Sequence, residues 1–177
     1  APGGPITIQK FSPLVKSGVE RGESLSSMLI IFDWDGTLCD STGTIVKAMC
    51  EAARRQNAPV PADSAVLDII GLSLPNAIAQ LFPCLSAQEK DSLRLGYSNI
   101  YRELDRTPAR LFPGVREILQ ELHDAGHHLA VATGKSRQGL DRVLRGLGAD
   151  HYFHGSRCAD ESQSKPHPQM LHELLDE

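Results

Sequence analysis

The sequence lacks a long apolar run. Its longest candidates, such as Leu29–Phe32, have the length of a strand, whereas a membrane-spanning helix needs roughly 18 apolar residues or more. It also lacks an excess of positive charge, because 18 Lys and Arg stand against 22 Asp and Glu, for a formal net charge of −4. Proteins that bind nucleic acids through phosphate contacts are normally basic. We therefore expect neither a membrane anchor nor a nucleic-acid partner.

Cysteine is scarce and scattered. The four cysteines form no Cys-x-x-Cys pair, the N-terminus shows no secretory signal pattern, and no Asn-x-Ser/Thr acceptor site is present. These absences favour a reduced protein in the cytoplasm. With 177 residues, of which 41% are hydrophobic and 23% charged, the chain can bury a core as one domain or as a compact domain with an inserted one.

Residues 1–27 differ in composition from the rest, because they are rich in Pro and Gly and show no sustained apolar period. We expect them to form a flexible leader or a non-native extension, with Met28 standing directly before the first strong strand. The alternative is an N-terminal arm that packs through its short apolar segments, Ile6–Ile8 and Phe11–Val15.

Short apolar runs alternate with amphipathic helical patterns along the rest of the chain. Strands are predicted at Leu29–Phe32, His128–Ala132 and Tyr152–Phe153. Helices are predicted at Ile45–Gln56, Ser64–Ile70, Pro75–Phe82, Gln88–Leu104, Val115–Ala125, Leu140–Leu147 and His167–Glu177. This alternation predicts right-handed βαβ units in an α/β fold with a doubly wound parallel sheet, and an all-helical block inserted after the first strand.

Two carboxylates, Asp33 and Asp35, directly follow the first predicted strand. Open α/β sheets bind their ligands at the carboxyl ends of strands, and Gly36 allows a turn after which both side chains can serve one pocket. Crowded carboxylates need a shared cation or a proton on one of them. The pair therefore implies a metal site, a division of acid and base roles, or both. A plain Asp-Gly turn that only caps a helix is the alternative.

The whole string from Asp33 to Ser41, DWDGTLCDS, resembles the first motif of the haloacid dehalogenase-like phosphohydrolases. Val131–Gly134 is similar to the second motif of this family, and Lys165–Pro168 is similar to the third, a Lys followed by Pro-x-Pro. Leu111–Val115 resembles the segment that re-enters the core after a helical cap. The resemblance covers Met28 to Glu177 and, in motif style, is closest to the phosphoglycolate phosphatase and β-phosphoglucomutase branch.

The resemblance implies a Rossmann-like core at residues 28–43 and 111–177, with a helical cap at residues 44–110. It also implies roles for the matched residues. Asp33 would be the nucleophile that forms an aspartyl-phosphate, and Asp35 would protonate the leaving alkoxide and later deprotonate water. Mg²⁺ would lie between the Asp33 carboxylate and the backbone carbonyl of Asp35.

Five further residues would bind the phosphoryl group. The Thr133 hydroxyl, with backbone amides near Gly134 and in the Gly36–Thr37 turn, would hold its oxygens. Lys165 would neutralise the charge shared by nucleophile and phosphate.

The sequence departs from the family pattern in one respect. The fourth motif, an acidic cluster that supplies another metal carboxylate, is not found, because only 12 residues follow Lys165 and they resemble a helix. We therefore expect a truncated chain whose core is incomplete at the C-terminus, with weakened Mg²⁺ binding and low activity. The sheet edge that this would expose favours a homodimer.

Other patterns carry less weight. Thr133-Gly134-Lys135-Ser136 imitates the end of a nucleotide-binding P-loop but lacks its first glycine, since Leu129 occupies that position. His123 and His127 are spaced for a metal, but Gly126 breaks the helix between them and surface roles are favoured. In the helical block, Ser73 and Asn76 could contact a leaving group or simply cap a helix.

The function implied is Mg²⁺-dependent hydrolysis of a small phosphorylated metabolite, a phosphoglycolate-like compound or a sugar phosphate. A second carboxylate at Asp35 favours phosphate esters over halides, because the true dehalogenases lack it. The alternatives are a phosphomutase of the same superfamily, which would require a bisphosphate activator, and a fragment that acts only as a binding module.

Overall fold

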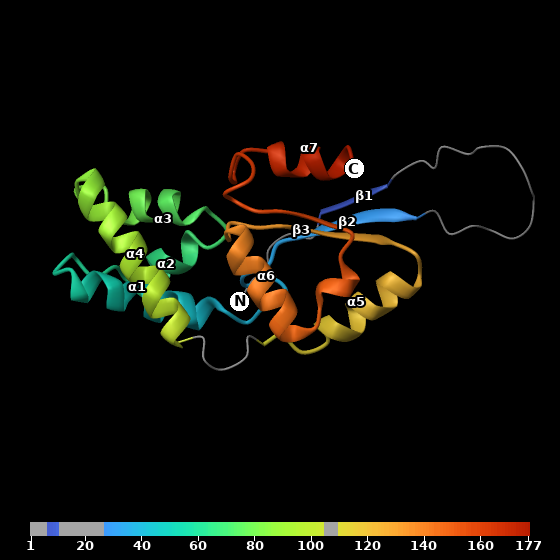
Figure 1. The fold of residues 1–177 in the computed structure, drawn as a ribbon, viewed down its shortest axis with the longest axis horizontal. Coiled ribbons are helices and arrows are strands. Elements are labelled where there is room, and N and C mark those ends of the chain that lie inside the picture. The colour runs from blue at the N-terminus through green and yellow to red at the C-terminus, as the bar shows by residue number, and fades with distance from the viewer. Residues whose placement is uncertain (1–6, 11–26, 105–109) are drawn as a thin grey trace, which may run out of the picture.

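The computed structural model describes residues 7–10, 27–104 and 110–177. Its sheet has the strand order β1-β2-β3-β4, with strands at Thr7–Lys10 (β1), Met28–Phe32 (β2), His128–Ala132 (β3) and Gly155–Arg157 (β4) (Figure 1). The β2, β3 and β4 strands are parallel, and β1 pairs with β2 in the antiparallel sense. The predicted α/β class with a parallel sheet is confirmed.

The β1 strand departs from the expectation of a flexible leader over residues 1–27. Thr7 pairs with Ile31 and Lys10 pairs with Met28, so four residues of this segment extend the sheet. The rest of the predicted leader, apart from Ser27, lies outside the described residues.

The prediction of a strand at Tyr152–Phe153 is wrong. Asp150–Tyr152 forms a 3₁₀ turn, and the strand begins two residues beyond Phe153, at Gly155. Tyr152 is buried because its ring packs in the core while its hydroxyl lies 3.2 Å from Oε1 of Gln120. The aromatic pair thus marks core packing, whereas the β4 residues Gly-Ser-Arg carry no apolar signal for a strand.

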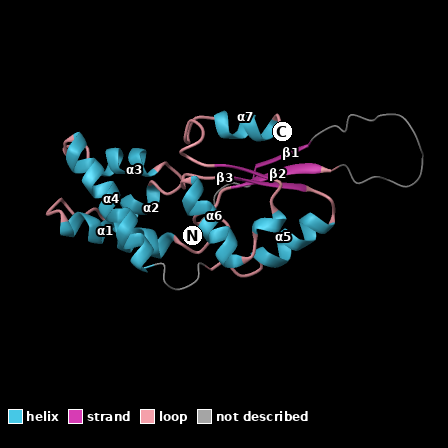
Figure 2. Ribbon diagram, in the orientation of Figure 1, coloured by secondary structure: helices cyan, strands magenta, loops and turns pink. Residues whose placement is uncertain are grey.

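Residues of β2 and β3 alternate between the two faces of the sheet, as the period of a strand requires. Ile30 and Phe32, like Leu129 and Val131, pack into one hydrophobic cluster with α5 (Val115–Asp124) and α6 (Arg137–Leu147). Ala130 and Ala132 face the opposite side, where α7 (Gln169–Leu175) covers them with Met170 and Leu174. Figure 2 shows these helices on the two faces of the sheet.

Four helices form a separate block between β2 and α5: Thr42–Arg55 (α1), Asp63–Asp68 (α2), Leu74–Leu81 (α3) and Ala87–Leu104 (α4). They bury a hydrophobic cluster of their own, which includes Met49, Ile78 and Leu93. A capping box begins α4, because the Ser86 amide donates to the Glu89 carboxylate and the Glu89 amide donates to Ser86 Oγ. The block's boundaries at residues 44 and 110 stay a prediction.

Several ends of helices differ slightly from the predicted ranges. The largest shifts are at α1, which begins at Thr42 rather than Ile45, and at α6, which begins at Arg137 rather than Leu140. In both helices the first turn contains a glycine and carries few apolar residues, so the apolar period becomes visible only later. Within the described part of the chain, no helix combines the length and apolarity that crossing a membrane would need.

Candidate functional site

The turn after β2 is held by the backbone of a buried tryptophan. The carbonyl of Trp34 accepts bonds from the amides of Thr37, Leu38 and Cys39 at 3.3, 3.0 and 3.0 Å. The Trp34 side chain is fully buried and contacts the Phe153 ring edge-on, with 6.3 Å between centroids. Trp34 therefore anchors the turn in the core.

Gly36 adopts a φ of +76°, a left-handed conformation that side chains disfavour. This conformation lets the chain turn back immediately after Asp35. The amides of Gly36 and Thr37 donate to the carbonyls of Cys39 and Trp34 inside the turn. Their predicted contact with a phosphoryl group therefore stays a prediction.

Asp33 contacts Lys165, as the matched motifs predict. The Lys165 Nζ lies 2.6 Å from Oδ1 of Asp33, although 132 residues separate the two in sequence. Both side chains are about 30% exposed, so the pair is partly accessible to solvent. The other carboxylate oxygen of Asp33, Oδ2, lies near Gly71. A Cβ built on Gly71 would be 3.7 Å from this oxygen.

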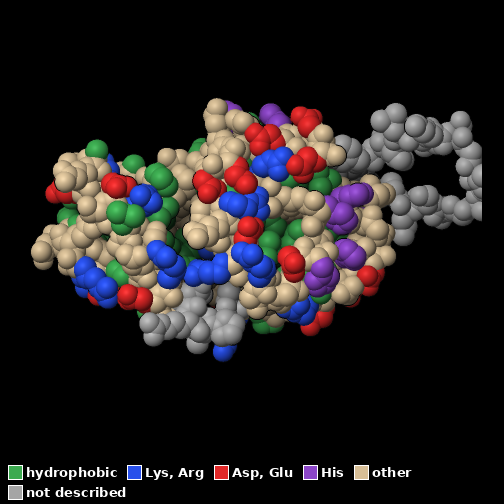
Figure 3. Space-filling model, in the orientation of Figure 1, with side chains coloured by type: hydrophobic (Ala, Val, Ile, Leu, Met, Phe, Trp, Pro, Cys, Tyr) green, Lys and Arg blue, Asp and Glu red, His purple; other side chains and the backbone are tan. Residues whose placement is uncertain are grey.

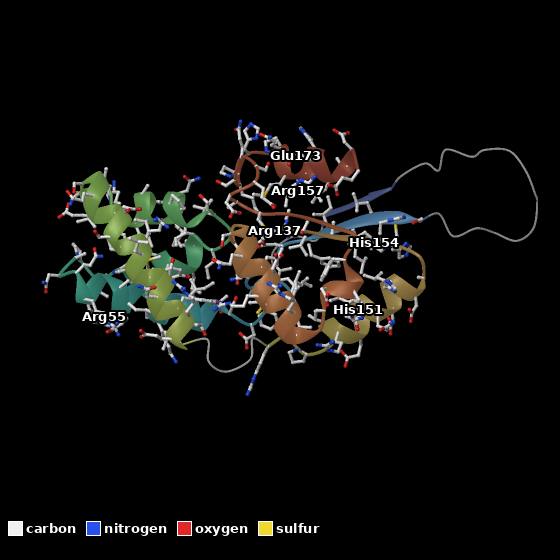
Figure 4. All side chains as sticks on the ribbon, viewed as in Figure 1. Arg55, Arg137, His151, His154, Arg157 and Glu173 are labelled. Atoms are coloured by element: carbon white, nitrogen blue, oxygen red, sulfur yellow. The ribbon has the colours of Figure 1, made fainter. Side chains whose placement is uncertain are left out.

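The loop that carries Lys165 is held by two ion pairs. Arg137 at the start of α6 forms a bidentate pair with Glu161, with both contacts at 2.8 Å. Arg157 of β4 contacts Glu173 of α7 at 2.9 Å (Figure 4). The Arg137 hydrogen bonds lower the pKa of Glu161 despite its partial burial, so the carboxylate form of this clamp is favoured.

Asp35 has two partners that the sequence did not reveal. Lys135 Nζ lies 3.1 Å from its Oδ1, and the Ser41 hydroxyl donates to the same oxygen at 2.6 Å. Burial, the largest single effect, would lower the pKa of Lys135, but Asp35 together with Tyr101 and Cys39 outweighs burial, so the pKa is raised. The ammonium form therefore persists in a nearly buried position.

The contact of Ser41 with Asp35 was not predicted because the position of Ser41 suggests a helix cap. It occupies the N-cap position of α1 but makes no side-chain cap bond, because its hydroxyl donates to Asp35 instead. The sequence analysis considered Lys135 only as part of a segment that imitates a nucleotide-binding P-loop. Its position directly after the second motif, at the carboxyl end of a buried strand, could have identified it as a site residue.

Thr133 is fully buried at the end of β3. Its Oγ1 accepts the Lys135 amide at 3.1 Å, a bond that uses a lone pair and leaves the hydroxyl proton free to donate. Ser136 then caps α6 by accepting the Gly139 amide at 3.2 Å. These two bonds hold the backbone at Lys135 and at the start of α6.

The helical block contacts the core at this same loop. A Cβ built on Gly134 would lie 2.2 Å from the Leu72 carbonyl oxygen, so only glycine allows the observed approach. Asn76 Nδ2 donates to Ser164 Oγ at 3.0 Å, and the Lys135 ammonium lies 5.0 Å from the centre of the Tyr101 ring. Ser73 caps α3 by accepting the Asn76 amide at 3.4 Å, which is the capping role left open by the sequence.

A cavity of about 600 Å³ lies between the helical block and the core. Asp35, Gly134 and Lys135 form part of its core wall, and Tyr97 and Tyr101 of α4 form part of the opposite wall. Burial, followed by the neighbouring Tyr101 and Asp35, raises the pKa of Tyr97 well above its ordinary value. Tyr97 therefore faces the cavity as a neutral phenol.

The donor set suits a magnesium ion. Asp33 and Asp35 offer hard carboxylate and carbonyl oxygens, and Mg²⁺ commonly binds through one or two carboxylates while keeping several waters. Among the described residues, no group of three His, Cys, Asp or Glu side chains is arranged to hold a metal.

Comparisons with known proteins agree with this geometry. Residues 30–177 match the family model of haloacid dehalogenase-like hydrolases. A probable phosphatase of Dickeya dadantii, IndB, is 36% identical over 80% of this chain and 64% of its own length. A phosphoglycolate phosphatase of Vibrio cholerae is 32% identical over 85% of this chain and 70% of its own length.

Solved structures show the same fold. The crystal structure of a predicted phosphoglycolate phosphatase from Haemophilus somnus superposes with a TM-score of 0.71 at 26% identity, covering 84% of this chain and 69% of that one. The chain thus spans about two thirds of the length of these relatives. With its family model matched from Ile30 to the last residue, the chain belongs to the haloacid dehalogenase-like hydrolase family.

Proposed function

We propose that the chain is a Mg²⁺-dependent phosphatase that hydrolyses a small phosphate monoester through an aspartyl-phosphate on Asp33. The observation that carries the proposal is that the two carboxylates contact different partners. Asp33 is paired with Lys165, whereas Asp35 is paired with Lys135 and Ser41. Two neighbouring carboxylates with different partners can take different chemical roles.

In the first step, an Asp33 carboxylate oxygen attacks phosphorus while the bond from phosphorus to the leaving oxygen breaks. Lys165 occupies Oδ1 of Asp33, so Oδ2 is the oxygen available for attack. This step requires the acid form of Asp35, so Asp35 takes up a proton as the substrate binds and gives it to the leaving oxygen, and an alcohol departs. Because both contacts to Asp35 fall on Oδ1, its Oδ2 is the oxygen that would carry this proton.

In the second step, water attacks the phosphorus of the aspartyl-phosphate and Asp35 takes up the water proton. The bond from phosphorus to Asp33 breaks, which restores both carboxyl groups and releases inorganic phosphate. Thr133 and Lys165 would hold the phosphoryl oxygens during both steps. Mg²⁺, held by the Asp33 carboxylate and the Asp35 backbone carbonyl, would supply positive charge that offsets the crowded anions.

The closed helical block supports this mechanism. Gly71 and Leu72 lie over the motif-two loop, and this contact would shield the aspartyl-phosphate from bulk water. A small phosphorylated metabolite as substrate fits a site that the helical block covers in part.

Release of inorganic phosphate from a panel of phosphate esters, with and without Mg²⁺, tests the proposal. We expect metal-dependent release that Asp33→Asn abolishes and that the matched variant Asp68→Asn, at an exposed position in α2, leaves unchanged. Release that survives Asp33→Asn would overturn the proposed nucleophile. Release that requires an added bisphosphate would instead identify a phosphomutase.

A further inference from the structure

Ring contacts link several histidines at the end of the core that lies away from the helical block. The ring of His154 lies 4.7 Å from that of His128 and 5.9 Å from that of His123 between centroids, and His123 and His151 both contact the ring of Tyr152. Figure 3 shows His side chains gathered on this surface, and Figure 4 labels His151 and His154. Among the residues that the structure describes, no such group is arranged to hold a metal ion.

His154 is bonded to β3 at two points. Its backbone amide donates to the Leu129 carbonyl at 2.8 Å, and its Nδ1 accepts the Leu129 amide at 3.2 Å. β4 begins at the next residue, Gly155, which pairs with Ala130. The imidazole of His154 therefore accepts an amide of β3 just before β4 begins, where the backbone carbonyl of a longer strand would accept it.

This bond satisfies an amide that lies away from water. Leu129 is fully buried, and buried backbone N–H groups are nearly always paired. An amide that loses its partner in such a place costs free energy, because neither protein nor water replaces the bond. His154 itself is exposed, so its ring exchanges protons with the solvent.

The start of β2 shows the same arrangement. The Met28 amide donates to Nδ1 of His127 at 3.3 Å, and the Ser27 hydroxyl donates to the Gly126 carbonyl at 2.7 Å. Two neighbouring strands of the parallel sheet therefore begin with an amide that an imidazole accepts.

An imidazole accepts through Nδ1 only while that nitrogen carries no proton. In the neutral ring one nitrogen donates and the other accepts, whereas both donate in the charged ring. A proton on Nδ1 of His154 would face the N–H of Leu129, so the ring would turn away and the amide would lose its acceptor. Histidine is the side chain that ordinarily changes its charge between pH 5 and 8.

The groups around His154 give a charged ring little support. From β3 and α5 it meets two further imidazoles, His128 and His123, which repel it when they are also charged. Tyr152 of the 3₁₀ turn contacts the His123 ring. The carboxylate that pairs with this group of rings, among the described residues, is Asp124 of α5, which lies 3.6 Å from His123 Nδ1 and is 65% exposed, so water screens it.

We propose that His154 is an acid-sensitive clasp between β3 and the start of β4, closed while its Nδ1 is unprotonated and opened by protonation. The clasp lies at the opposite end of the strands from Asp33 and Thr133, which follow the ends of β2 and β3. It is therefore independent of the proposed phosphatase. Mild acid should loosen the start of β3 before the rest of the protein unfolds.

Long-range proton–nitrogen NMR spectra of protein labelled on histidine test the clasp in the unaltered chain. At about pH 7.5, where an ordinary histidine is mostly neutral, we expect His154 to carry its proton on Nε2 and to leave Nδ1 unprotonated. A His154 ring that carries its proton on Nδ1 would overturn the proposal.

Hydrogen exchange of the Leu129 amide measures the opening. Between about pH 7.5 and about pH 5.5, where histidine ordinarily titrates, protection corrected for the intrinsic exchange rate should fall. We expect a fall of about 10-fold, the equivalent of one ordinary hydrogen bond. The pKa of Glu161 lies below 4.5, so its ion pair with Arg137 stays intact over this range. Protection that does not change with pH would contradict the clasp.

His154→Asn separates protonation of the ring from general effects of acid. The Oδ1 of Asn accepts an amide as Nδ1 does, but this side chain does not titrate. We expect His154→Asn to keep the protection of Leu129 at both pH values and His154→Leu to lose it at both.

His172→Asn, at an exposed position in α7, is the matched control and should show the pH dependence of the parent protein. A His154→Asn variant that leaves Leu129 unprotected at the lower pH would overturn the proposal. Full protection of Leu129 in His154→Leu would overturn it as well.

Discussion

The carbonyl oxygen of Leu72 in the helical block lies so close to Gly134 in the core that a Cβ on this glycine would be 2.2 Å away. Van der Waals contact requires well over 3 Å between such atoms, and both partners at this point are backbone. The closed position of the helical block therefore depends on the missing side chain at Gly134.

Gly134→Ala should displace the helical block from the catalytic loop. We expect kcat/KM for phosphate release to fall by about 10- to 100-fold, because a displacement near 1 Å misplaces the reacting groups. Gly146→Ala is the matched control, since no described atom lies within 4 Å of a Cβ there. The control should keep full activity and gain up to about 1 kcal/mol of stability, because Ala is favoured over Gly inside a helix. Full activity of Gly134→Ala would contradict the close approach.

Lys135→Met should impair the acid and base steps more than substrate binding. Lys135 lies 3.1 Å from Asp35. Of the two side-chain contacts to the Asp35 carboxylate described above, only that from the Ser41 hydroxyl remains when Lys135 is replaced. We expect kcat to fall by about 10- to 100-fold, at or below the lower end of the roughly 10²- to 10⁴-fold that a positioned acid or base contributes, because Asp35 itself remains, with a smaller change in KM. The exposed Lys47→Met serves as control. A rise in KM at constant kcat would instead assign Lys135 to substrate binding.

The Arg137–Glu161 clamp should make stability depend on pH in the acid range. The pKa of Glu161 in the folded protein lies below its ordinary value of 4.5, chiefly because of the Arg137 hydrogen bonds. The clamp's contribution is therefore fully present above pH 4.5 and is lost as the pH falls through the lowered pKa. We expect Glu161→Gln to cost about 1 kcal/mol at neutral pH, a modest value because the pair is partly exposed.

Urea unfolding of Glu161→Gln and the parent protein across the acid range measures this effect. The difference in unfolding free energy should shrink as the pH drops below 4.5. Glu117→Gln, at an exposed position in α5, should show no such convergence. A difference that stays constant with pH would contradict the ion pair.

The cysteines should differ sharply in reactivity. Cys84 is exposed, whereas Cys39, Cys50 and Cys158 are buried. Burial raises the pKa of Cys158 to about 12, and the thiolate is the reactive form. We expect one thiol to react quickly with a thiol reagent in the folded protein and the others only after unfolding. Raising the pH to about 9 should leave Cys158 unreactive; its rapid labelling there would contradict its burial.

The strands and helices that were predicted well are those whose buried apolar residues form a continuous run or recur with a regular period along the chain. Leu29–Phe32 and His128–Ala132 are continuous apolar runs because both faces of these strands are covered. β4 was misplaced because the residues Gly-Ser-Arg bury no large side chain, and their pairing with β3 alone defines the strand. β1 was missed for a similar reason, since its position depends on pairing with β2.

The site was predicted in part. The contact between Asp33 and Lys165 follows from a resemblance in which both residues lie in matched motifs. The partners of Asp35 were missed because Lys135 reaches it through a tertiary contact, and because the Ser41 hydroxyl turns back to Asp35 from the N-cap position of α1. The residues of α4 that line the cavity do so across a tertiary contact between the helical block and the core, which also meet at Gly134, and no local pattern encodes that placement.

The central claim is that Asp33 carries the phosphoryl group during turnover. Its most direct test is to mix the protein with substrate and Mg²⁺, quench with acid during turnover, and map the modified peptide by mass spectrometry. The proposed mechanism predicts a phosphoryl group on the Asp33 side chain that is absent in Asp33→Asn and in the protein without substrate. Turnover with no phosphorylated peptide, or with the group on another residue, would contradict it.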